Sequence, residues 1–549
     1  RELIAAPEAS APHDAERSRP YVTDVHAPGP FANEPPVEIR RPAARERFTV
    51  ALARVETTLG FEVPLIVAGA ERRTDDRLRS VDPGDYATVV CDSASATVAD
   101  VEQAVAIARD AWPAWAATGW DERAATLFRA AAAMREQRDD LAALIVFEAG
   151  KPVIEADADV CEAIDFLEYY GRDAMTLGAG APLLQVPGES NRYGYQPRGI
   201  GVVIAPWNFP LSIPTGMVSA ALVTGNAVLF KPAEQTPGIA WRLARILLDA
   251  GVPPGVFAFL PGVGETIGPP MVEHPDVSFI TFTGSRAVGL EIVRRAANPQ
   301  TAPRQVKRVV AEMGGKNAIV VDSDADLDEA VPAIVQSAFS YAGQKCSAAA
   351  RVIAVGGVHD SLVERLAGAA QLVPIGHPRN LETVVGPVID EDAYRRVRDY
   401  QAFAARDGRI VVQRDDVPDG GWYVGPTVVV LDGTSSPVAN DEIFGPVIAV
   451  FHARDFDHAI ALANDTPYAL TAGCFSRSPA HLERAARELR AGNIYLNRGI
   501  TGAMVGRQPF GGYGLSGVGS KAGGPDYLHQ FVDPRAIAEN TMRQGFAPD

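Results

Sequence analysis

Two short segments of this sequence carry side chains suited to covalent acyl chemistry. Cys346 lies in the sequence GQKCS, and Glu312 begins the sequence EMGGK upstream of it. A cysteine thiolate is a strong nucleophile, and a carboxylate elsewhere in the site can activate water. The glycines predict tight turns around both residues. The pair therefore predicts a thiol enzyme with a separate base that hydrolyses the covalent intermediate.

Length and composition indicate a globular protein of several domains. The chain has 549 residues, of which 47% are hydrophobic and 22% are charged. A chain of this length buries a large core without disulfide or metal staples. The net charge of −17 argues against non-specific binding to nucleic acid or to an anionic membrane surface. We therefore expect a small-molecule partner, with neither a nucleic acid nor a membrane among the partners.

The four cysteines are widely scattered, at positions 91, 161, 346 and 474. This spacing predicts neither a zinc site nor a disulfide framework, and we expect Cys91, Cys161 and Cys474 to be small buried hydrophobes. No metal site is predicted from the histidines either. The sequence has no run of ~18 apolar residues that would span a membrane. The first residues lack the layout of a signal peptide, so we expect a cytoplasmic location.

The N-terminal region differs in composition from the rest of the chain. Residues 1–42 are rich in proline, which predicts an extended arm, either disordered or wrapped over the body. From Thr97 apolar residues recur at helical spacing, and Thr97–Asp100 predicts a capping box. A second helix is predicted over about residues 121–147, ending at Gly150, and a further one over about residues 155–170.

From Gly199 onward short apolar runs alternate with helical segments, which predicts parallel βαβ units in doubly wound sheets. The economical account is two α/β domains in series, followed by a glycine-rich segment over residues 506–531 and a final strand. Strands are expected at residues 201–205, 227–230, 256–260, 277–282, 317–321 and 351–355. Helices are expected at residues 210–224, up to about 250, 287–297 and 327–340.

A nucleotide site is predicted at the ends of these strands. Lys231 and Glu234 follow the strand at 227–230, and an acidic side chain there accepts ribose hydroxyls and repels a 2′-phosphate, which favours NAD over NADP. Thr283, Gly284 and Ser285 lead from a strand into a helix, whose first N–H groups suit a pyrophosphate. The glycine segment around Gly264 resembles a dinucleotide fingerprint but is one residue too long for it, and glycine pairs of this kind are more often plain turns.

Six motifs follow one another in an order that resembles the aldehyde dehydrogenase superfamily, from about residue 60 to 535. They are residues 206–210 (PWNFP), 231–234, 282–285, 312–315, 343–346 and 442–446. The resemblance implies an α/β fold with a Rossmann-like NAD domain (59–179 and 198–311) and a catalytic domain (312–497). It also implies a β flap (180–197 and 498–535), flanked by an arm (1–58) and a tail (536–549). The flap exposes a sheet edge, so a homodimer or larger homo-oligomer is expected.

The resemblance also implies roles for individual residues. Cys346 would form a thiohemiacetal and then a thioester, the Asn208 amide and the Cys346 N–H would bind the oxyanion, and Glu312 would activate water. Lys345, a following helix start or the nicotinamide could raise the thiolate fraction of Cys346. Further cofactor contacts are implied at Ile204, Pro206, Trp207, Gly314, Glu442 and Phe444.

Local details resemble one group of this superfamily, the L-glutamate γ-semialdehyde (Δ1-pyrroline-5-carboxylate) dehydrogenases. They are the sequence GQKCS, the tail TGAMVGRQPFGG from Thr501, and NEP at residues 33–35. The substrate's α-carboxylate would meet the Ser347 hydroxyl and the N–H groups of Gly502 and Ala503; many members carry serine in place of Ala503. Phe209 and Phe510 would pack on its aliphatic part. Glu162 would hold the α-ammonium, or belong to a solvated helix face.

The expected activity is therefore NAD-dependent oxidation of L-glutamate γ-semialdehyde to L-glutamate, the second step of proline catabolism. Three alternatives stay open. The chain could act on another semialdehyde, or have a non-catalytic role. It could also be the dehydrogenase half of a bifunctional proline-oxidising protein, with the proline-rich arm as its linker.

Overall fold

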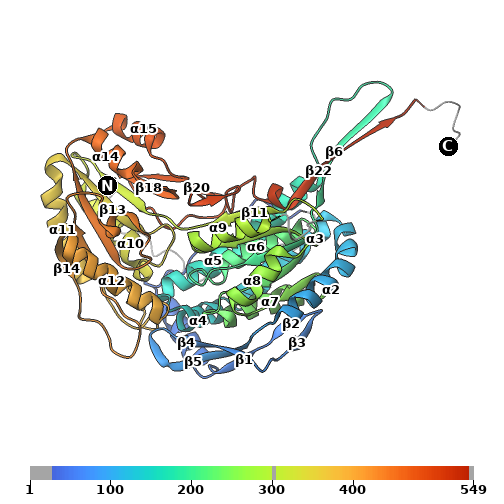
Figure 1. Cartoon of the computed structure of the whole chain (residues 1–549), viewed down its shortest axis with the longest axis horizontal. Coiled ribbons are helices and arrows are strands. Elements are labelled where there is room, and N and C mark those ends of the chain that lie inside the picture. The colour runs from blue at the N-terminus through green and yellow to red at the C-terminus, as the bar shows by residue number, and fades with distance from the viewer. Residues whose placement is uncertain (1–26, 299–303, 543–549) are drawn as a thin grey trace, which may run out of the picture.

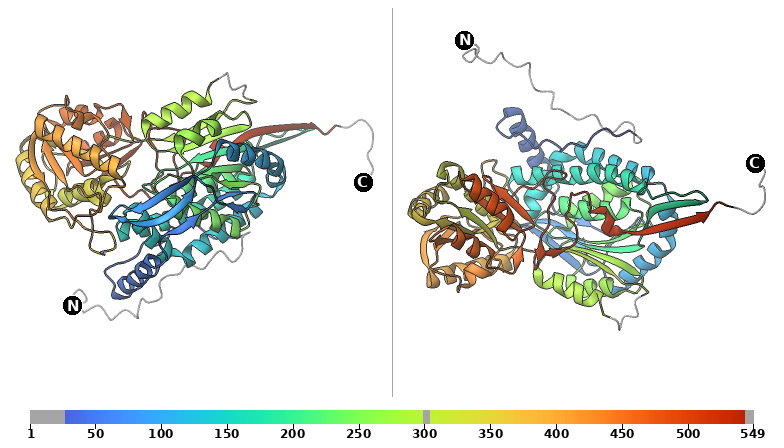
Figure 2. Two further views of the ribbon diagram at one scale, coloured as in Figure 1. Left: turned by 60° about the horizontal axis from the view of Figure 1, so that its bottom comes forward. Right: turned by 90° about the horizontal axis from the view of Figure 1, so that it is seen from above.

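The computed structural model describes residues 27–298 and 304–542. Two α/β bodies lie side by side, and a long ribbon of paired strands projects from the larger body (Figures 1 and 2). The first 26 residues of the predicted arm lie outside the described residues.

The larger body is built on a mainly parallel sheet with the strand order β21-β11-β10-β7-β8-β9-β2-β3. Its centre is parallel from β11 to β9, and β21, β2 and β3 run antiparallel to their neighbours. The central strands β7, β8 and β10 are buried along almost their whole length because helices cover both faces. The strands are β2 (Leu65–Val67), β3 (Ala70–Arg72), β7 (Ile200–Ile204), β8 (Ala227–Lys231), β9 (Phe257–Phe259), β10 (Val277–Thr283), β11 (Arg308–Glu312) and β21 (Gly517–Val518).

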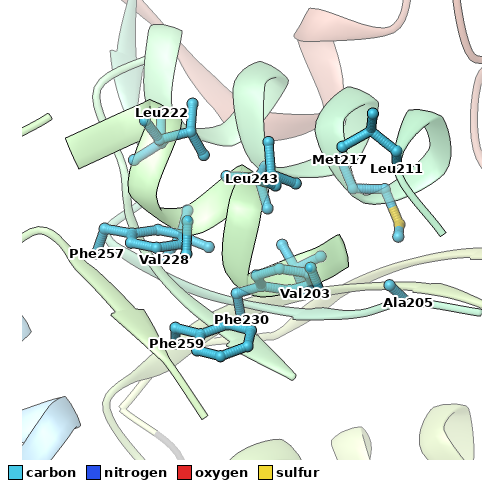
Figure 3. Packing of buried hydrophobic residues seen from close by; sticks show 14 of the residues in the cluster. Val203, Ala205, Leu211, Met217, Leu222, Val228, Phe230, Leu243, Phe257 and Phe259 are labelled. Atoms are coloured by element: carbon cyan, nitrogen blue, oxygen red, sulfur yellow. The ribbon is translucent and has the colours of Figure 1, made fainter. Parts of the chain in front are cut away.

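Helix α6 connects β7 to β8 and α7 connects β8 to β9, and both pack on one face, as Figure 3 shows for Met217, Leu222 and Leu243 above Val203 and Phe230. Helices α2, α8 and α9 pack on the other face. The predicted capping box of Thr97 and Asp100 forms at the start of α2. These helices are α2 (Val98–Ala117), α6 (Ser212–Val223), α7 (Pro237–Asp249), α8 (Gly264–Glu273) and α9 (Arg286–Ala296).

Three further helices form an outer layer: α3 (Trp120–Glu136), α4 (Arg138–Ala149) and α5 (Val153–Gly178). The prediction of one helix over residues 121–147 was wrong. Gln137 adopts φ −103° and ψ 9°, which ends α3, and α4 starts at the next residue. The apolar pattern runs on across this break and hides it from the sequence. Gly150 ends α4 at φ 63°, as predicted.

The smaller body is a second, mainly parallel sheet with the order β14-β15-β16-β13-β12-β18-β19. Its strands are β12 (Asn317–Val321), β13 (Ala349–Val355), β14 (Arg409–Gln413), β15 (Thr427–Val430), β16 (Val447–Ala453), β18 (Thr471–Phe475) and β19 (Asn493–Leu496). The helices around it are α10 (Leu327–Phe339), α11 (His359–Leu372), α12 (Glu391–Asp407), α13 (Pro437–Asn440), α14 (Phe456–Asn464) and α15 (Pro479–Glu488).

The projecting ribbon pairs β6 (Glu189–Pro197) with β22 (Val532–Asn540) in antiparallel register. It brings together the two segments assigned to the flap. Its pairing continues to Asn540 opposite Glu189, so the strand extends into the segment assigned to the tail. The residues beyond Val532 are mostly exposed and lack an apolar alternation, so the sequence gives no signal for this extension.

The remaining described elements connect the two bodies and the arm. Residues 28–38 have no regular secondary structure, and α1 (Pro42–Glu56) follows after a turn. A small sheet orders β1 (Phe61–Val63), β5 (Asp85–Ala94) and β4 (Arg77–Asp82) as β1-β5-β4, and β17 (Tyr468–Ala469) pairs with β20 (Tyr513–Gly514). Among the described residues, no helix combines the length and apolar character needed to cross a bilayer.

Candidate active site

The predicted residues of the first domain gather at one edge of its sheet. Strand β7 ends at Ile204, β8 at Lys231, β10 at Thr283 and β11 at Glu312. Because these strands run parallel, their C-terminal ends share one edge, which is where open α/β sheets bind nucleotides. The segment PWNFP extends this edge directly beyond β7.

Cys346 lies in a turn whose backbone is hydrogen-bonded by one asparagine side chain. The turn connects a 3-10 segment, Ser340–Gly343, to β13. Asn317, the first residue of β12, donates its side-chain amide to the carbonyl oxygens of Cys346 at 2.7 Å and of Ala348 at 2.9 Å. Two hydrogen bonds from one buried side chain thus fix the backbone at Cys346 and two residues beyond it.

The Asn208 side chain is bound to the same turn from the other domain. It is 4% exposed, and its Nδ2 donates to the carbonyl oxygen of Gln344 at 3.0 Å. Gln344 is itself fixed, because its amide donates to Pro387 and accepts from the backbone N–H of Ile389. One N–H of the Asn208 amide makes this contact, and the second remains to donate to a substrate oxygen.

The surroundings of Cys346 disfavour its thiolate. Burial and the nearby carboxylates of Glu442 and Glu312 raise the pKa of this thiol to about 12, and a hydrogen bond from the Ser347 N–H opposes the rise. Lys345, one of the three groups that could raise the thiolate fraction, is directed elsewhere. Its ammonium group is engaged by Glu155 Oε1 at 2.6 Å. No helix start follows the cysteine either, because the chain turns directly into β13.

Glu312 occupies the end of β11, enclosed by the glycine-rich tail. Its Oε2 accepts a hydrogen bond from the Gly512 N–H at 3.2 Å. A Cβ at Gly511 would lie 2.6 Å from its Oε1, so a larger residue there would displace the carboxylate. Burial raises the pKa of Glu312 to about 8, although Gly512 and Lys521 favour the charged form. A carboxyl group of this kind suits proton transfer near neutral pH.

Glu442 and Phe444 reach the site from the second domain. The Glu442 carboxylate accepts a hydrogen bond from the Gly315 N–H at 3.0 Å and lies so close to Gly314 that a Cβ would clash. Burial raises the pKa of Glu442 to about 7. The Phe444 ring meets Trp207 edge to face at 5.5 Å. These contacts place the predicted cofactor residues of the two domains against one another.

Lys231 and Glu234 form an ion pair of 2.9 Å, and the Gly264 N–H donates to the same Glu234 oxygen at 2.6 Å. This brings together three residues predicted to contact the cofactor. Ser285 caps α9 through Val288, so the N-terminal N–H groups of α9 begin at the same sheet edge. A carboxylate for ribose hydroxyls and helix-start donors for phosphates fit a dinucleotide.

The predicted substrate side chains lie on several elements. Ser347 is buried, and Phe209 packs against Lys151, whose Nζ lies 3.6 Å from the ring centroid. Glu162, on α5, is partly buried rather than on a solvated face, and burial raises its pKa to about 7. Its charge acts on the Cys346 thiol, so it lies within electrostatic reach of the nucleophile.

The remaining substrate residues lie in the segment after β19. Gly502 adopts φ +77°, a left-handed conformation that favours glycine. In the part of the chain that the structure describes, the N–H groups of Gly502 and Ala503 make no hydrogen bond. Phe510 pairs with Ala522 through backbone hydrogen bonds in both directions. Two adjacent free N–H donors at such a turn suit an anion.

Several supporting residues were missed by the sequence reasoning. Asn317 fixes the Cys346 turn, Lys521 contributes positive charge near Glu312, and Tyr495 lies close enough for its ionisation to be coupled to that of Cys346. Asn317 directly follows EMGGK, which is the one signal that could have identified it. The buried state of Cys91, Cys161 and Cys474 was predicted and is confirmed. The described residues hold no cluster suited to a metal ion.

The comparison with known protein families places this fold in one enzyme family. The chain belongs to the aldehyde dehydrogenase family, whose sequence model matches residues 70–537. The resemblance and the α/β fold predicted from the six motifs are thereby confirmed.

Individual relatives are similar over almost the whole chain. The 1-pyrroline-5-carboxylate dehydrogenase of Geobacillus thermodenitrificans is 46% identical over 510 residues, covering 93% of this chain and 99% of the relative. The solved structure of 1-pyrroline-5-carboxylate dehydrogenase from Thermus with bound NAD gives a TM-score of 0.91 at 42% identity, covering 93% of this chain and 99% of that one.

A larger protein contains a similar region. The structure of proline utilization A from Bdellovibrio bacteriovorus, inactivated by N-propargylglycine, gives a TM-score of 0.93 at 45% identity. The match covers 95% of this chain but only 54% of that protein, so this chain spans about half its length.

Proposed function

We propose that this enzyme oxidises L-glutamate γ-semialdehyde, in equilibrium with 1-pyrroline-5-carboxylate, to L-glutamate with NAD, the second step of proline catabolism. The observation that carries the proposal is that Asn208, Cys346 and Glu312 lie together where the two sheets meet. The chain is also similar over almost its whole length to 1-pyrroline-5-carboxylate dehydrogenases.

The first step forms a bond between Cys346 and the aldehyde carbon. The thiol releases its proton to solvent as its sulfur adds, and the carbonyl oxygen becomes an oxyanion that accepts from the second N–H of Asn208 and from the Cys346 N–H. NAD, when bound, supplies the acceptor for the hydride that the carbon loses. A thioester on Cys346 remains.

The second step hydrolyses this thioester. Glu312 removes a proton from water, the hydroxyl adds to the thioester carbon, and the C–S bond breaks to release the carboxylate product and the cysteine. The carboxylate of Glu312 is held by the Gly512 N–H at the end of β11 and has no ion-pair partner among the described residues, so it is available as a base.

The cofactor would lie along the sheet edge. Glu234 would accept the ribose hydroxyls of the adenosine half, with Lys231 and Gly264 beside it, and Thr283, Gly284 and Ser285 would face the phosphates. Glu442 and Phe444 would hold the nicotinamide half against Trp207. The backbone around Ile204, Pro206 and Gly314 completes these proposed contacts.

The amino-acid end of the substrate would bind beyond the nucleophile. Ser347 and the unbonded N–H groups of Gly502 and Ala503 would bind the α-carboxylate, and Phe209 and Phe510 would pack on the aliphatic chain. Glu162 would face the α-ammonium group, since a carboxyl group in a partly buried position favours a cationic partner.

The projecting flap, made of residues 180–197 and of β22, which pairs with β6, would join subunits of a homo-oligomer. It projects from the body and exposes large apolar side chains, among them Leu184 at 85% and Ile537 at 39%. Deleting residues 536–549 removes the outer part of β22, and light scattering should then report a smaller assembly. An unchanged mass would contradict this role of the flap.

The deciding experiment measures NADH formation from 1-pyrroline-5-carboxylate, with NADP in parallel. Wild type should turn over with NAD, Cys346→Ala should not, and Cys474→Ala, a change at a buried cysteine far from the chemistry, should retain activity. Turnover by Cys346→Ala would overturn the mechanism. Failure of wild type with this substrate, alongside good turnover of another aldehyde, would overturn the substrate.

A further inference from the structure

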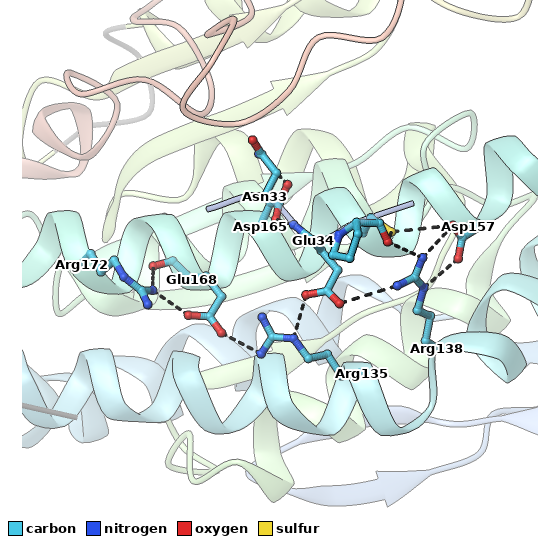
Figure 4. Close-up of polar contacts among 10 residues, drawn as sticks. Asn33, Glu34, Arg135, Arg138, Asp157, Asp165, Glu168 and Arg172 are labelled. Atoms are coloured by element: carbon cyan, nitrogen blue, oxygen red, sulfur yellow. Dashed lines mark hydrogen bonds and ion pairs between the residues drawn. The ribbon is translucent and has the colours of Figure 1, made fainter. Parts of the chain in front are cut away.

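The described part of the N-terminal arm is fixed on the outer helices by a polar network (Figure 4). The Glu34 carboxylate accepts from Arg135 at 2.8 Å and lies 3.6 Å from Arg138. Arg138 in turn pairs with the buried Asp157 at 2.7 Å. Because these charges are largely buried and mutually satisfied, the arm has one defined register on α3, α4 and α5.

One residue of the arm, Asn33, contacts both helix α5 and the segment that follows β19. The side-chain amide of Asn33 donates both to Asp165 Oδ2 and to the carbonyl oxygen of Val505, each at 2.8 Å. The other Asp165 oxygen accepts from the Glu34 N–H at 2.6 Å, which fixes that carboxylate. The Phe31 ring packs beside the same segment, because its nearest atom would lie 3.0 Å from a Cβ at Gly506.

Val505 ends the segment proposed to bind the substrate carboxylate. At the other end of this segment Ile500 is buried, and its N–H donates to Ser337 at 3.2 Å. Gly502 and Ala503 lie between these two anchors. The direction of their free N–H groups therefore depends on where the backbone is held at Ile500 and at Val505.

We infer that Asn33 is a positioning residue for substrate recognition, holding the turn at Gly502 and Ala503 in the geometry that binds the substrate's α-carboxylate. The inference rests on the proposed function, which supplies the carboxylate. Small displacements of oriented donors weaken binding strongly, so a residue remote from the nucleophile can set specificity. The arm thereby joins the specificity site, although it precedes the α/β domains in the sequence.

The test uses the Asn33→Ala and Asn33→Asp variants of the full chain, both of which remove the donor to Val505. The matched control is Asn464→Ala, which removes an asparagine donating to the carbonyl oxygen of Glu488 in the other domain. Each protein is assayed with 1-pyrroline-5-carboxylate and with propanal, which lacks a carboxylate. L-Glutamate is added as a competitive inhibitor of propanal oxidation.

Both Asn33 variants should raise the KM for 1-pyrroline-5-carboxylate about tenfold and the Ki of L-glutamate by a similar factor. Propanal turnover and the KM for NAD should match the control, which also shows that the variants fold. Unchanged KM and Ki, or an equal loss with both aldehydes, would overturn the inference. Wild type that oxidises propanal but not 1-pyrroline-5-carboxylate would instead overturn the proposed function, and the inference with it.

Discussion

Glu312 and Gly512 are 200 residues apart in the sequence, yet the carboxylate of the first accepts the backbone N–H of the second at 3.2 Å. The contact closes the glycine-rich tail over the end of β11 and excludes water from one side of the carboxylate. This enclosure is the reason that burial dominates the ionisation of Glu312 and raises its pKa to about 8.

The base role of Glu312 predicts a pH dependence. A base must be ionised, so wild-type kcat should rise with pH up to about 8, the pKa of this carboxyl group, and level off above it. In Glu312→Gln, steady-state kcat should fall about 10²- to 10⁴-fold, while a rapid burst of NADH near one per subunit persists. Stopped-flow absorbance measures both. If Glu312→Gln shows no burst, Glu312 acts before the thioester has formed, which contradicts its assigned role in hydrolysis.

The raised pKa of Cys346 predicts slow alkylation by iodoacetamide. Between pH 7 and pH 10 the rate should climb roughly tenfold per pH unit without a plateau, because only the thiolate reacts. Removing the Glu442 charge in Glu442→Gln should increase the rate at pH 8 several-fold. Since the pKa of Glu442 is about 7, the difference between the two proteins should vanish below about pH 6. Mass spectrometry measures the labelling, with Cys346→Ala as the blank.

The contact between Asn208 and Gln344 predicts a rate defect without a cofactor defect. Asn208→Ala removes an oxyanion donor, so kcat/KM should fall about 10²- to 10³-fold. The KM for NAD should stay within about twofold, because the residue acts on the transition state. Asn464→Ala again serves as the matched control. Loss of NAD binding in Asn208→Ala would indicate that the amide maintains the structure rather than the oxyanion.

Much of the fold was predictable from the sequence because each strand of the parallel sheets is a short apolar run bounded by turn residues. The break at Gln137 was not, since apolar periodicity continues across it. The outer part of β22 was also missed. Its residues are exposed and pair with β6 through the backbone, so their side chains form no apolar pattern that would predict a strand. Lys345 illustrates a third limit: its partner Glu155 is 190 residues away, and nothing local in the sequence indicates the pairing.

The nucleotide preference depends on Glu234, and its contacts with Lys231 and Gly264 give a direct test. In Glu234→Ser the carboxylate that would repel a 2′-phosphate is lost and the Lys231 ammonium, which it held at 2.9 Å, becomes free to attract one. The ratio of kcat/KM for NADP to that for NAD should therefore rise by about tenfold or more. Glu265→Ser removes an exposed acid from the first turn of α8 and should leave the ratio unchanged. If both variants shift it equally, the effect belongs to overall charge, and Glu234 has no specific role in recognising the ribose.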